Sequence, residues 1–277
     1  MLLDPFDSPP TADYSQWQAD DYFGTYYADA ILPDEQRVLD YQIEVLRSAD
    51  YRFGRALEYG CGPTLHRAIA ASRYAFRIDM ADWLPDNLAQ VRSWLGAPAS
   101  NPDWRRFTRF ILELEDAHTG NTERAVSAAR IERREARTRK VVRNLELSDA
   151  RRRQPLGPAR EGFYDLLISG FCIDAVSCEK RIWARCMRNV LSMLEPGGLL
   201  ILHALYRCRA YRVAQQMFPG ADLSRDDVFA SLLANGFTRR SIDIQVVGCS
   251  EGLEYGYSGI LMACGRKSQN ASRRGDP

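Results

Sequence analysis

The sequence predicts an α/β fold with a mostly parallel, doubly wound sheet. Short apolar runs alternate with helical patterns along most of the 277 residues, which is typical of such sheets. A Gly-x-Gly turn follows the first apolar run, as at many ligand-binding strand–helix junctions. The last two apolar runs follow one another without a helix between them, which predicts an antiparallel edge.

The elements can be expected in order from periodicity and from start and stop signals. Ser224, for example, is placed to cap a helix that Gly236 ends. The expected helices are a segment after Pro33, 64–71, a segment after Pro85, 119–137, 179–194 and 224–235. The expected strands are 55–59, 76–82, 106–114, 140–147, 165–171, 199–205, 242–247 and 258–264, with a tight turn at 195–198.

Composition excludes several classes of protein. The net charge is +1, and the basic run at 130–140 alternates with acids, so we expect no nucleic-acid partner. No apolar run approaches the length of a membrane span, and the first ten residues lack the pattern of a signal peptide, so we expect a cytoplasmic protein with no membrane partner. Seven scattered cysteines and three histidines predict no metal site.

The stretch Glu58-Tyr59-Gly60-Cys61-Gly62-Pro63-Thr64 carries the first sign of function. Its glycines allow a ligand to approach the backbone, but the third glycine of the dinucleotide motif is absent. A carboxylate at Glu58 would repel a pyrophosphate and attract the ammonium and sulfonium charges of S-adenosylmethionine. An ordinary strand–turn–helix without a ligand remains the alternative from this stretch alone.

An aromatic segment precedes the first strand. It holds Tyr14, Trp17, Tyr22, Phe23, Tyr26 and Tyr27. Such a segment can be a lid that closes over a ligand, or a helix packed on the domain. We expect a tail and lid over residues 1–50, a ligand-binding domain over 51–267 and a flexible tail over 268–277.

Together these stretches resemble the class I S-adenosylmethionine-dependent methyltransferases, and more narrowly the nicotinamide, phenylethanolamine and indolethylamine N-methyltransferase family. The resemblance rests on the segments Asp21 to Tyr27, Gly60 to Thr64, Asp82 to Asn87, Ser169 to Ala175 and Leu194 to Gly198. It implies a Rossmann-like, seven-stranded sheet with an N-terminal helical lid. It implies S-adenosylmethionine as cofactor, S-adenosylhomocysteine as product and no metal.

The resemblance also implies the residues that bind the cofactor. Glu58 would balance the amino group, Asp82 would accept the ribose hydroxyls, and Asp149 would accept the adenine amino group. Where the family has a tyrosine after Gly-Pro-Thr, this chain has His66, which puts one carboxylate contact in doubt. The full expected set is Tyr22, Tyr27, Glu58, Gly60, Gly62, Thr64, His66, Asp82, Trp83, Asn87, Asp149, Ala150 and Gly170.

The acceptor side departs further from the family. Asp174 stands where the family has a substrate-facing acid, and it either binds the acceptor or caps the next helix. His203 either acts as a base or is structural. The expected substrate-binding residues are Tyr26, Asp174, His203, Arg207 and Tyr211, with Asp174 and His203 as candidate catalytic residues.

These residues predict methylation of a small molecule. The leading hypothesis is N-methylation of an aromatic amine or N-heterocycle in bacterial specialised metabolism. The alternatives are O- or C-methylation of an electron-rich small molecule, or S-adenosylmethionine binding without catalysis. The sequence leaves open whether the protein is a monomer or a homo-oligomer.

Overall fold

The sheet has seven strands and one antiparallel edge, as the sequence predicts. The computed structural model describes residues 13–96, 102–121 and 125–269. Five strands pair in parallel, and near one edge a single strand that runs in the opposite direction pairs antiparallel with both of its neighbours. Across the sheet they are β3 (Val142–Leu147), β2 (Ile78–Asp82), β1 (Ala56–Tyr59), β4 (Tyr164–Gly170), β5 (Leu194–Leu205), β9 (Gly259–Arg266) and β8 (Asp243–Gly248).

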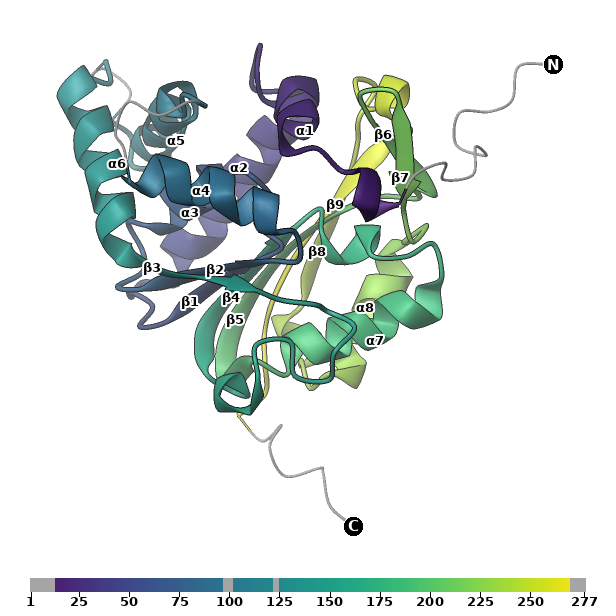
Figure 1. Ribbon diagram of the computed structural model, residues 1–277. Coiled ribbons are helices and arrows are strands. Elements are labelled where there is room, and N and C mark those ends of the chain that lie inside the picture. Colours follow the sequence, from purple (N-terminus) through teal and green to yellow (C-terminus); the bar gives the residue numbers. More distant parts are fainter. Residues whose placement is uncertain (1–12, 97–101, 122–124, 270–277) are drawn as a thin grey trace.

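Helices cover both faces of this sheet (Figure 1). One face carries α2 (Pro33–Ser48), α3 (His66–Ala71), α4 (Pro85–Gly96), α5 (Arg105–His118) and α6 (Ala128–Val141). The other face carries α7 (Lys180–Leu191) and α8 (Arg225–Ala234). Each face has its own apolar core, because strand side chains alternate between the two faces.

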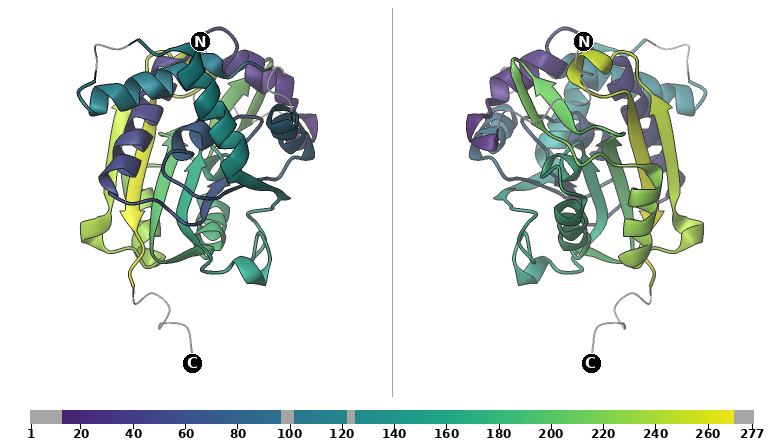
Figure 2. Two further views of the ribbon diagram at one scale, coloured as in Figure 1. Left: turned by 90° about the vertical axis from the view of Figure 1, so that its left-hand side faces the viewer. Right: turned by 90° about the vertical axis from the view of Figure 1, so that its right-hand side faces the viewer.

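Two further elements lie together at one end of the sheet (Figures 1 and 2). They are helix α1 (Ala19–Tyr26) and a hairpin of β6 (Ala210–Val213) and β7 (Gln216–Pro219), and they contact each other. A short 3-10 turn, η2 (Tyr14–Gln16), precedes α1. The remaining 3-10 turns are η3 (Pro158–Arg160), η4 (Ile173–Ala175), η5 (Arg239–Ser241) and η6 (Leu253–Tyr255). The aromatic N-terminal segment thus caps the carboxyl ends of the parallel strands.

Several element predictions are wrong. Residues 106–114 belong to helix α5, whose buried Phe107 and Ile111 lie one helical turn apart. The helix predicted at 119–137 is displaced and begins at Ala128. The segment 195–198 lies inside strand β5, where Gly197 has a φ of +84° and the pairing register with β4 shifts. The β6–β7 hairpin was not predicted.

The predicted boundary at residue 50 falls between helix α2 and strand β1. Helix α2 lies before residue 50, yet its side chains Val38, Leu39 and Ile43 are fully buried in the main core. Residues 1–12 and 270–277, which hold most of the two predicted tails, lie outside the described residues. The domain boundaries therefore stay a prediction.

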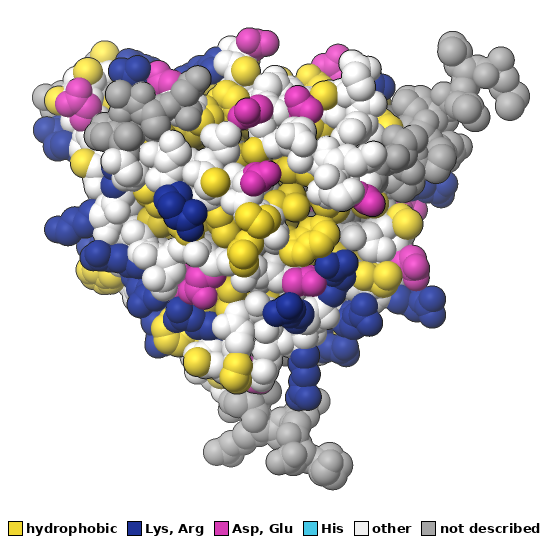
Figure 3. Space-filling model, viewed as in Figure 1, with side chains coloured by type: hydrophobic (Ala, Val, Ile, Leu, Met, Phe, Trp, Pro, Cys, Tyr) yellow, Lys and Arg dark blue, Asp and Glu magenta, His cyan; other side chains and the backbone are white. Residues whose placement is uncertain are grey.

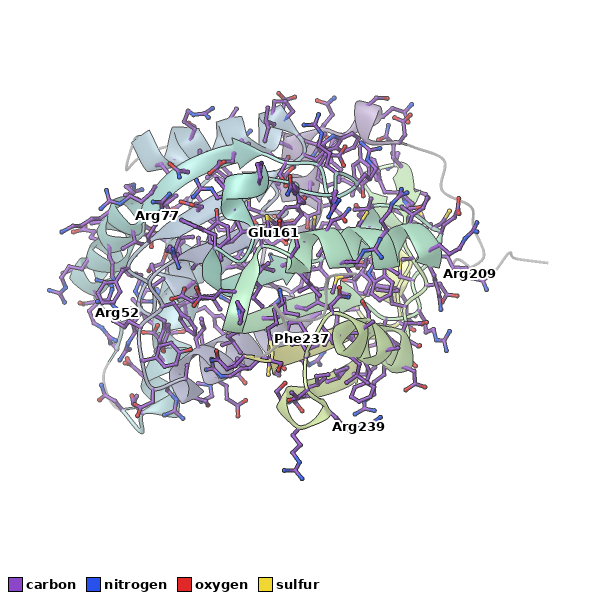
Figure 4. The ribbon with its side chains drawn as sticks, turned by 90° about the horizontal axis from the view of Figure 1, so that it is seen from below. Arg52, Arg77, Glu161, Arg209, Phe237 and Arg239 are labelled. Atoms are coloured by element: carbon purple, nitrogen blue, oxygen red, sulfur yellow. The ribbon has the colours of Figure 1, made fainter. Side chains whose placement is uncertain are left out.

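Surface features bear on the expected partners. None of the helices in the described part of the chain is long and apolar enough to cross a membrane. Seen from below, Arg52 and Arg77 lie at one end of the molecule and Arg209 at the other (Figure 4). Arginines therefore lie at both ends of the molecule in this view, and the absence of a nucleic-acid partner stays a prediction.

Candidate active site

The glycine turn between β1 and α3 forms the floor of the candidate site. Gly60 and Gly62 have φ values of +70° and +58°, which side-chain-bearing residues rarely adopt. A Cβ atom at Gly60 would lie 1.9 Å from the Sγ atom of Cys172. The backbone N–H groups of Gly60 and Cys61 both donate to the carbonyl of Ala81 on β2. The turn is therefore fixed and leaves its upper side open to a ligand.

A cavity of about 460 Å³ opens above this turn. It lies within the size range of small-molecule sites. Hydrophobic side chains gather on this face between α4 and η2 (Figure 3). Among the expected residues, those that line the cavity are Tyr22, Gly60, Gly62, Thr64, Asp82, Trp83, Asn87, Asp149, Ala150, Gly170 and Tyr211.

Asp82 organises one wall of the cavity from the end of β2. Its Oδ2 accepts the N–H of Gly62 at 2.8 Å, and its Oδ1 accepts the N–H of Leu84 at 2.9 Å and the amide of Asn87 at 3.0 Å. Burial raises the pKa of Asp82, and these hydrogen bonds oppose that rise. The carboxylate therefore ties the Asn87 side chain of α4 and the residue before this helix to the glycine turn. Carboxylate oxygens can accept further hydrogen bonds from a ligand hydroxyl.

The opposite end of the cavity is shaped by the loop after β3. Burial would raise the pKa of the Asp149 carboxyl, but hydrogen bonds from Arg151 hold it below its usual value. The Arg151 guanidinium also lies over the half-exposed ring of Trp83, 4.7 Å from its centroid. A flat cleft between an aromatic ring, a carboxylate and backbone suits a heterocyclic base.

Glu58 lies beneath the cavity, directly before the lining residues Tyr59 and Gly60. It is buried, and neither of its carboxylate oxygens has a hydrogen-bond partner. Burial raises the pKa of this carboxyl to about 8. Buried carboxylates without partners are costly, so the position is suited to a cationic group that is brought by a ligand.

A second, smaller chamber of about 40 Å³ adjoins the cavity. The lining residues Tyr22, Phe171, Ala175 and Tyr211 belong to both. The chamber is otherwise lined by Tyr26, Tyr27, Leu32, Asp34, Glu35, Leu205 and Tyr257. Two carboxylates thus face an aromatic enclosure, and no Lys, Arg or His lines it among the described residues. The chamber can recognise a cation or an N–H donor.

Asp174 lies between two residues of this chamber wall. Its Oδ2 accepts the N–H of Leu205 at 2.9 Å, whereas its buried Oδ1 has no hydrogen-bond partner. Burial raises the pKa of the carboxyl to about 6. Asp174 does not itself line the chamber, but Ala175 and Leu205 do.

Five expected residues line neither cavity: Glu58 and Asp174, described above, and His66, His203 and Arg207. His203 is fully buried in β5, and burial lowers its pKa to about 3. His66 is also fully buried, stacked on Trp104 with its Nε2 atom 2.9 Å from Glu35 Oε1. Arg207 lies near the surface, with its guanidinium 3.9 Å from Asp222 Oδ1. This structure does not bring the side chains of these last three residues to a ligand.

Other residues enter the site without having been expected there. Arg67 lines the larger cavity, and Asp34, Glu35 and Tyr257 line the smaller one. Trp17 donates its indole N–H to Asn87 Oδ1 at 2.9 Å. Trp17 could have been suspected from its place in the aromatic N-terminal segment. The other four residues belong to no motif that the sequence shows. Among the described residues, no group of three or more His, Cys, Asp or Glu side chains could hold a metal ion.

Replacing Gly60 with Ala should abolish ligand binding at the turn and destabilise the protein by about 2 kcal/mol or more. The added Cβ would collide with Cys172 Sγ, and the positive φ is itself unfavourable for alanine. Chemical denaturation and ligand titration would measure both effects. Gly96→Ala is the matched control, because its added Cβ meets no atom within 4 Å at a φ that alanine tolerates. Equal stability of the two variants would contradict the role given to Gly60.

The sequence is similar to those of known N-methyltransferases. The profile of the NNMT/PNMT/TEMT family matches residues 9–268. Human nicotinamide N-methyltransferase is 26% identical over 182 residues, which cover 66% of this chain and 65% of that protein, just under two thirds of its length. Rabbit (Oryctolagus cuniculus) indolethylamine N-methyltransferase is 25% identical over 225 residues, which cover 78% of this chain and 81% of that protein.

A solved structure supports the fold. The 1,6-didemethyltoxoflavin-N1-methyltransferase of Burkholderia thailandensis, solved with 1,6-didemethyltoxoflavin and S-adenosylhomocysteine, superposes with a TM-score of 0.53. The alignment covers 95% of this chain and 93% of that chain at 14% identity. At this identity the likeness concerns the fold alone.

Proposed function

The chain belongs to the NNMT/PNMT/TEMT family of S-adenosylmethionine-dependent methyltransferases, and we propose that it methylates a nitrogen atom of a small aromatic amine or N-heterocycle. The relatives named above are N-methyltransferases, which supports nitrogen as the acceptor atom. A place in bacterial specialised metabolism is part of the same proposal.

The residues present fit S-adenosylmethionine. Glu58, a buried carboxylate without a partner, suits the ammonium group, and Asp82 has acceptor capacity for ribose hydroxyls. The cleft beside Trp83 and Asp149 suits the adenine ring and its amino group. The glycine turn leaves room for the methionine chain. When bound, S-adenosylmethionine supplies an electrophilic methyl group.

The acceptor class rests on one observation: carboxylates and tyrosines line the small chamber, and no basic side chain does so among the described residues. The chamber, at about 40 Å³, is too small for a ring, but an aromatic amine bound in the larger cavity can direct its N–H groups or its positive charge toward it. Glu35 is paired with Arg67. Among the described residues, Asp34 accepts hydrogen bonds only from the neutral Tyr257 hydroxyl and a backbone N–H, so an anionic phenolate would meet the negative potential of Asp34. The chamber therefore favours nitrogen over oxygen acceptors.

The chain's residues would then orient the acceptor and accept a proton. An amine must present a free lone pair, so a protonated amine has to lose a proton first. We assign this role to Asp174, whose Oδ1 atom has no partner. The aromatic rings of α1 close one side of the chamber and exclude water. Alignment of acceptor and methyl group can lower the barrier by about 7–11 kcal/mol.

The proposal predicts selective methylation of amines by the full-length protein. We expect S-adenosylmethionine-dependent mass gains of one methyl on aromatic amines or N-heterocycles, and not on phenols of matched ring size. Mass spectrometry of a paired amine and phenol panel would measure this, with isothermal titration of S-adenosylhomocysteine alongside. Methylation of phenols alone would refute the nitrogen assignment, and absence of S-adenosylhomocysteine binding would refute the cofactor assignment.

A further inference from the structure

A buried arginine lies at the methionine end of the cavity. Arg67, on α3, lines the larger cavity although its side chain is almost completely buried. Its Nε–H group has no hydrogen-bond partner. An unpaired N–H donor on a buried guanidinium is costly, and an anionic ligand group would satisfy it.

Neighbouring groups fix this guanidinium in place. The Nη2 atom of Arg67 donates to both carboxylate oxygens of Glu35, at 3.1 and 3.0 Å. Although burial would raise the pKa of Glu35, Arg67 and His66 lower it to about 2. Gly170 gives the side chain its space, because a Cβ atom there would lie 2.4 Å from Arg67 Nε. Arg67 is thus held at the end of β4, where the cavity begins.

The surrounding charges match an amino acid zwitterion. Glu58, which also lacks partners, directly precedes the residues Tyr59 and Gly60, which line the same cavity as Arg67. Burial raises the pKa of Glu58, and the Arg67 charge opposes that rise. The carboxylate of Glu58 and the Nε–H group of Arg67, both without a hydrogen-bond partner, therefore belong to the same end of the site. The α-amino group and α-carboxylate of a bound methionine chain carry the complementary charges, so that each buried group would gain its missing partner.

We propose that Arg67 binds the α-carboxylate of the methionine part of S-adenosylmethionine, and so replaces a contact that His66 does not make. This inference rests on the proposed function. His66 lies outside the cavity, packed between Trp104 and Tyr27 with its Nε2 atom at Glu35. Tyr22 and Tyr27, whose hydroxyl oxygens lie 3.4 Å apart, remain as neutral contributors nearby. Arg67 supplies the positive charge at this end of the site.

Two ligands separate this role from a purely structural one. S-adenosylhomocysteine carries the α-carboxylate, whereas 5′-methylthioadenosine has the same nucleoside without the amino acid group. We expect Arg67→Gln to weaken binding of S-adenosylhomocysteine at least about tenfold and to change that of 5′-methylthioadenosine by less than about twofold. Arg67→Lys should restore part of the loss. Isothermal titration of the full-length variants would give both affinities.

The matched control is Arg134→Gln. Arg134 is a buried arginine that donates to Glu115 at 2.9 and 2.7 Å and lines neither cavity of the site. The Arg134→Gln variant should be less stable than the wild-type protein, but the ratio of its affinities for S-adenosylhomocysteine and 5′-methylthioadenosine should be unchanged. If Arg67→Gln weakens both ligands equally, or neither, the inference is overturned while the proposed function stands. If the wild-type protein binds no S-adenosylhomocysteine, the proposed function falls and this inference with it.

Discussion

Replacing Glu58 with Gln is expected to weaken S-adenosylhomocysteine binding about 10- to 100-fold and to stabilise the free protein at alkaline pH. The buried carboxylate has no protein partner, so a ligand ammonium is the group that it can pair with. Glutamine keeps the shape and removes the charge. The ligand then loses its ion pair, and the free protein loses a group that is costly to ionise.

The sign of the stability effect follows from the pKa. Burial raises the pKa of Glu58 from 4.5 to about 8 in the folded protein. Below pH 4.5 the carboxyl is protonated in both states, so this group's contribution to stability is fully present. As the pH rises through 8 that contribution is lost, at a cost on the order of 4–5 kcal/mol. Denaturant unfolding at pH 5.5 and 8.5 should therefore show a larger gain for Glu58→Gln at the higher pH.

Ligand binding should show the opposite dependence on pH. Glu58 must ionise to pair with an ammonium group, so wild-type affinity for S-adenosylhomocysteine should rise between pH 6 and 8. The Glu58→Gln variant should lack this rise. Glu161→Gln is a suitable control, because Glu161 is exposed in the loop before β4, whereas Glu58 is buried directly before the lining residues Tyr59 and Gly60. A wild-type affinity that does not change over this range would contradict the assignment of Glu58.

Site residues that belong to one local unit could be predicted from the sequence. Gly60, Gly62 and Asp82 stand at the ends of neighbouring parallel strands, so the fold class alone brings them together. Asn87 follows Asp82 within one turn of α4 and needs no long-range contact. Their spacing in the sequence is enough to predict that they lie together, and all four line the larger cavity.

Other parts of the site depend on packing that no motif encodes. Tyr257 donates its hydroxyl to Asp34 across 223 residues of sequence, and both line the small chamber. The β6–β7 hairpin contributes Tyr211, although its strands are only four residues long. His203 is buried because both faces of β5 are covered, so that every residue from 199 to 204 is buried whichever face it occupies.

Helix α5 could have been predicted from its periodicity. Phe107, Phe110, Ile111 and Leu114 stand at i, i+3, i+4 and i+7, which is the spacing of one helix face, whereas a half-buried strand would alternate apolar and polar residues. The buried Phe107 and Ile111 pack into the core shared with α2 and α3, which the local sequence does not reveal.

Replacing Asp174 with Asn is expected to lower kcat by a factor of about 10²–10⁴ and to leave the affinity for S-adenosylhomocysteine within about twofold. Asparagine keeps an oxygen that can accept the N–H of Leu205, so the chamber wall is preserved. Its NH₂ group would replace Oδ1 and cannot take a proton from the acceptor. The loss should therefore appear in turnover and not in cofactor binding.

The pH profile provides a second test of Asp174. Burial raises its pKa to about 6, so the wild-type rate should fall as the pH drops through 6 and the carboxylate becomes protonated. The Asn variant should lack that limb. Asp165→Asn is the matched control, because Asp165 also accepts backbone N–H groups, of Gly54 and Arg55, but at the opposite end of β4. If Asp174→Asn retains both the rate and the acidic limb, another group accepts the proton and Asp174 serves only to hold Leu205.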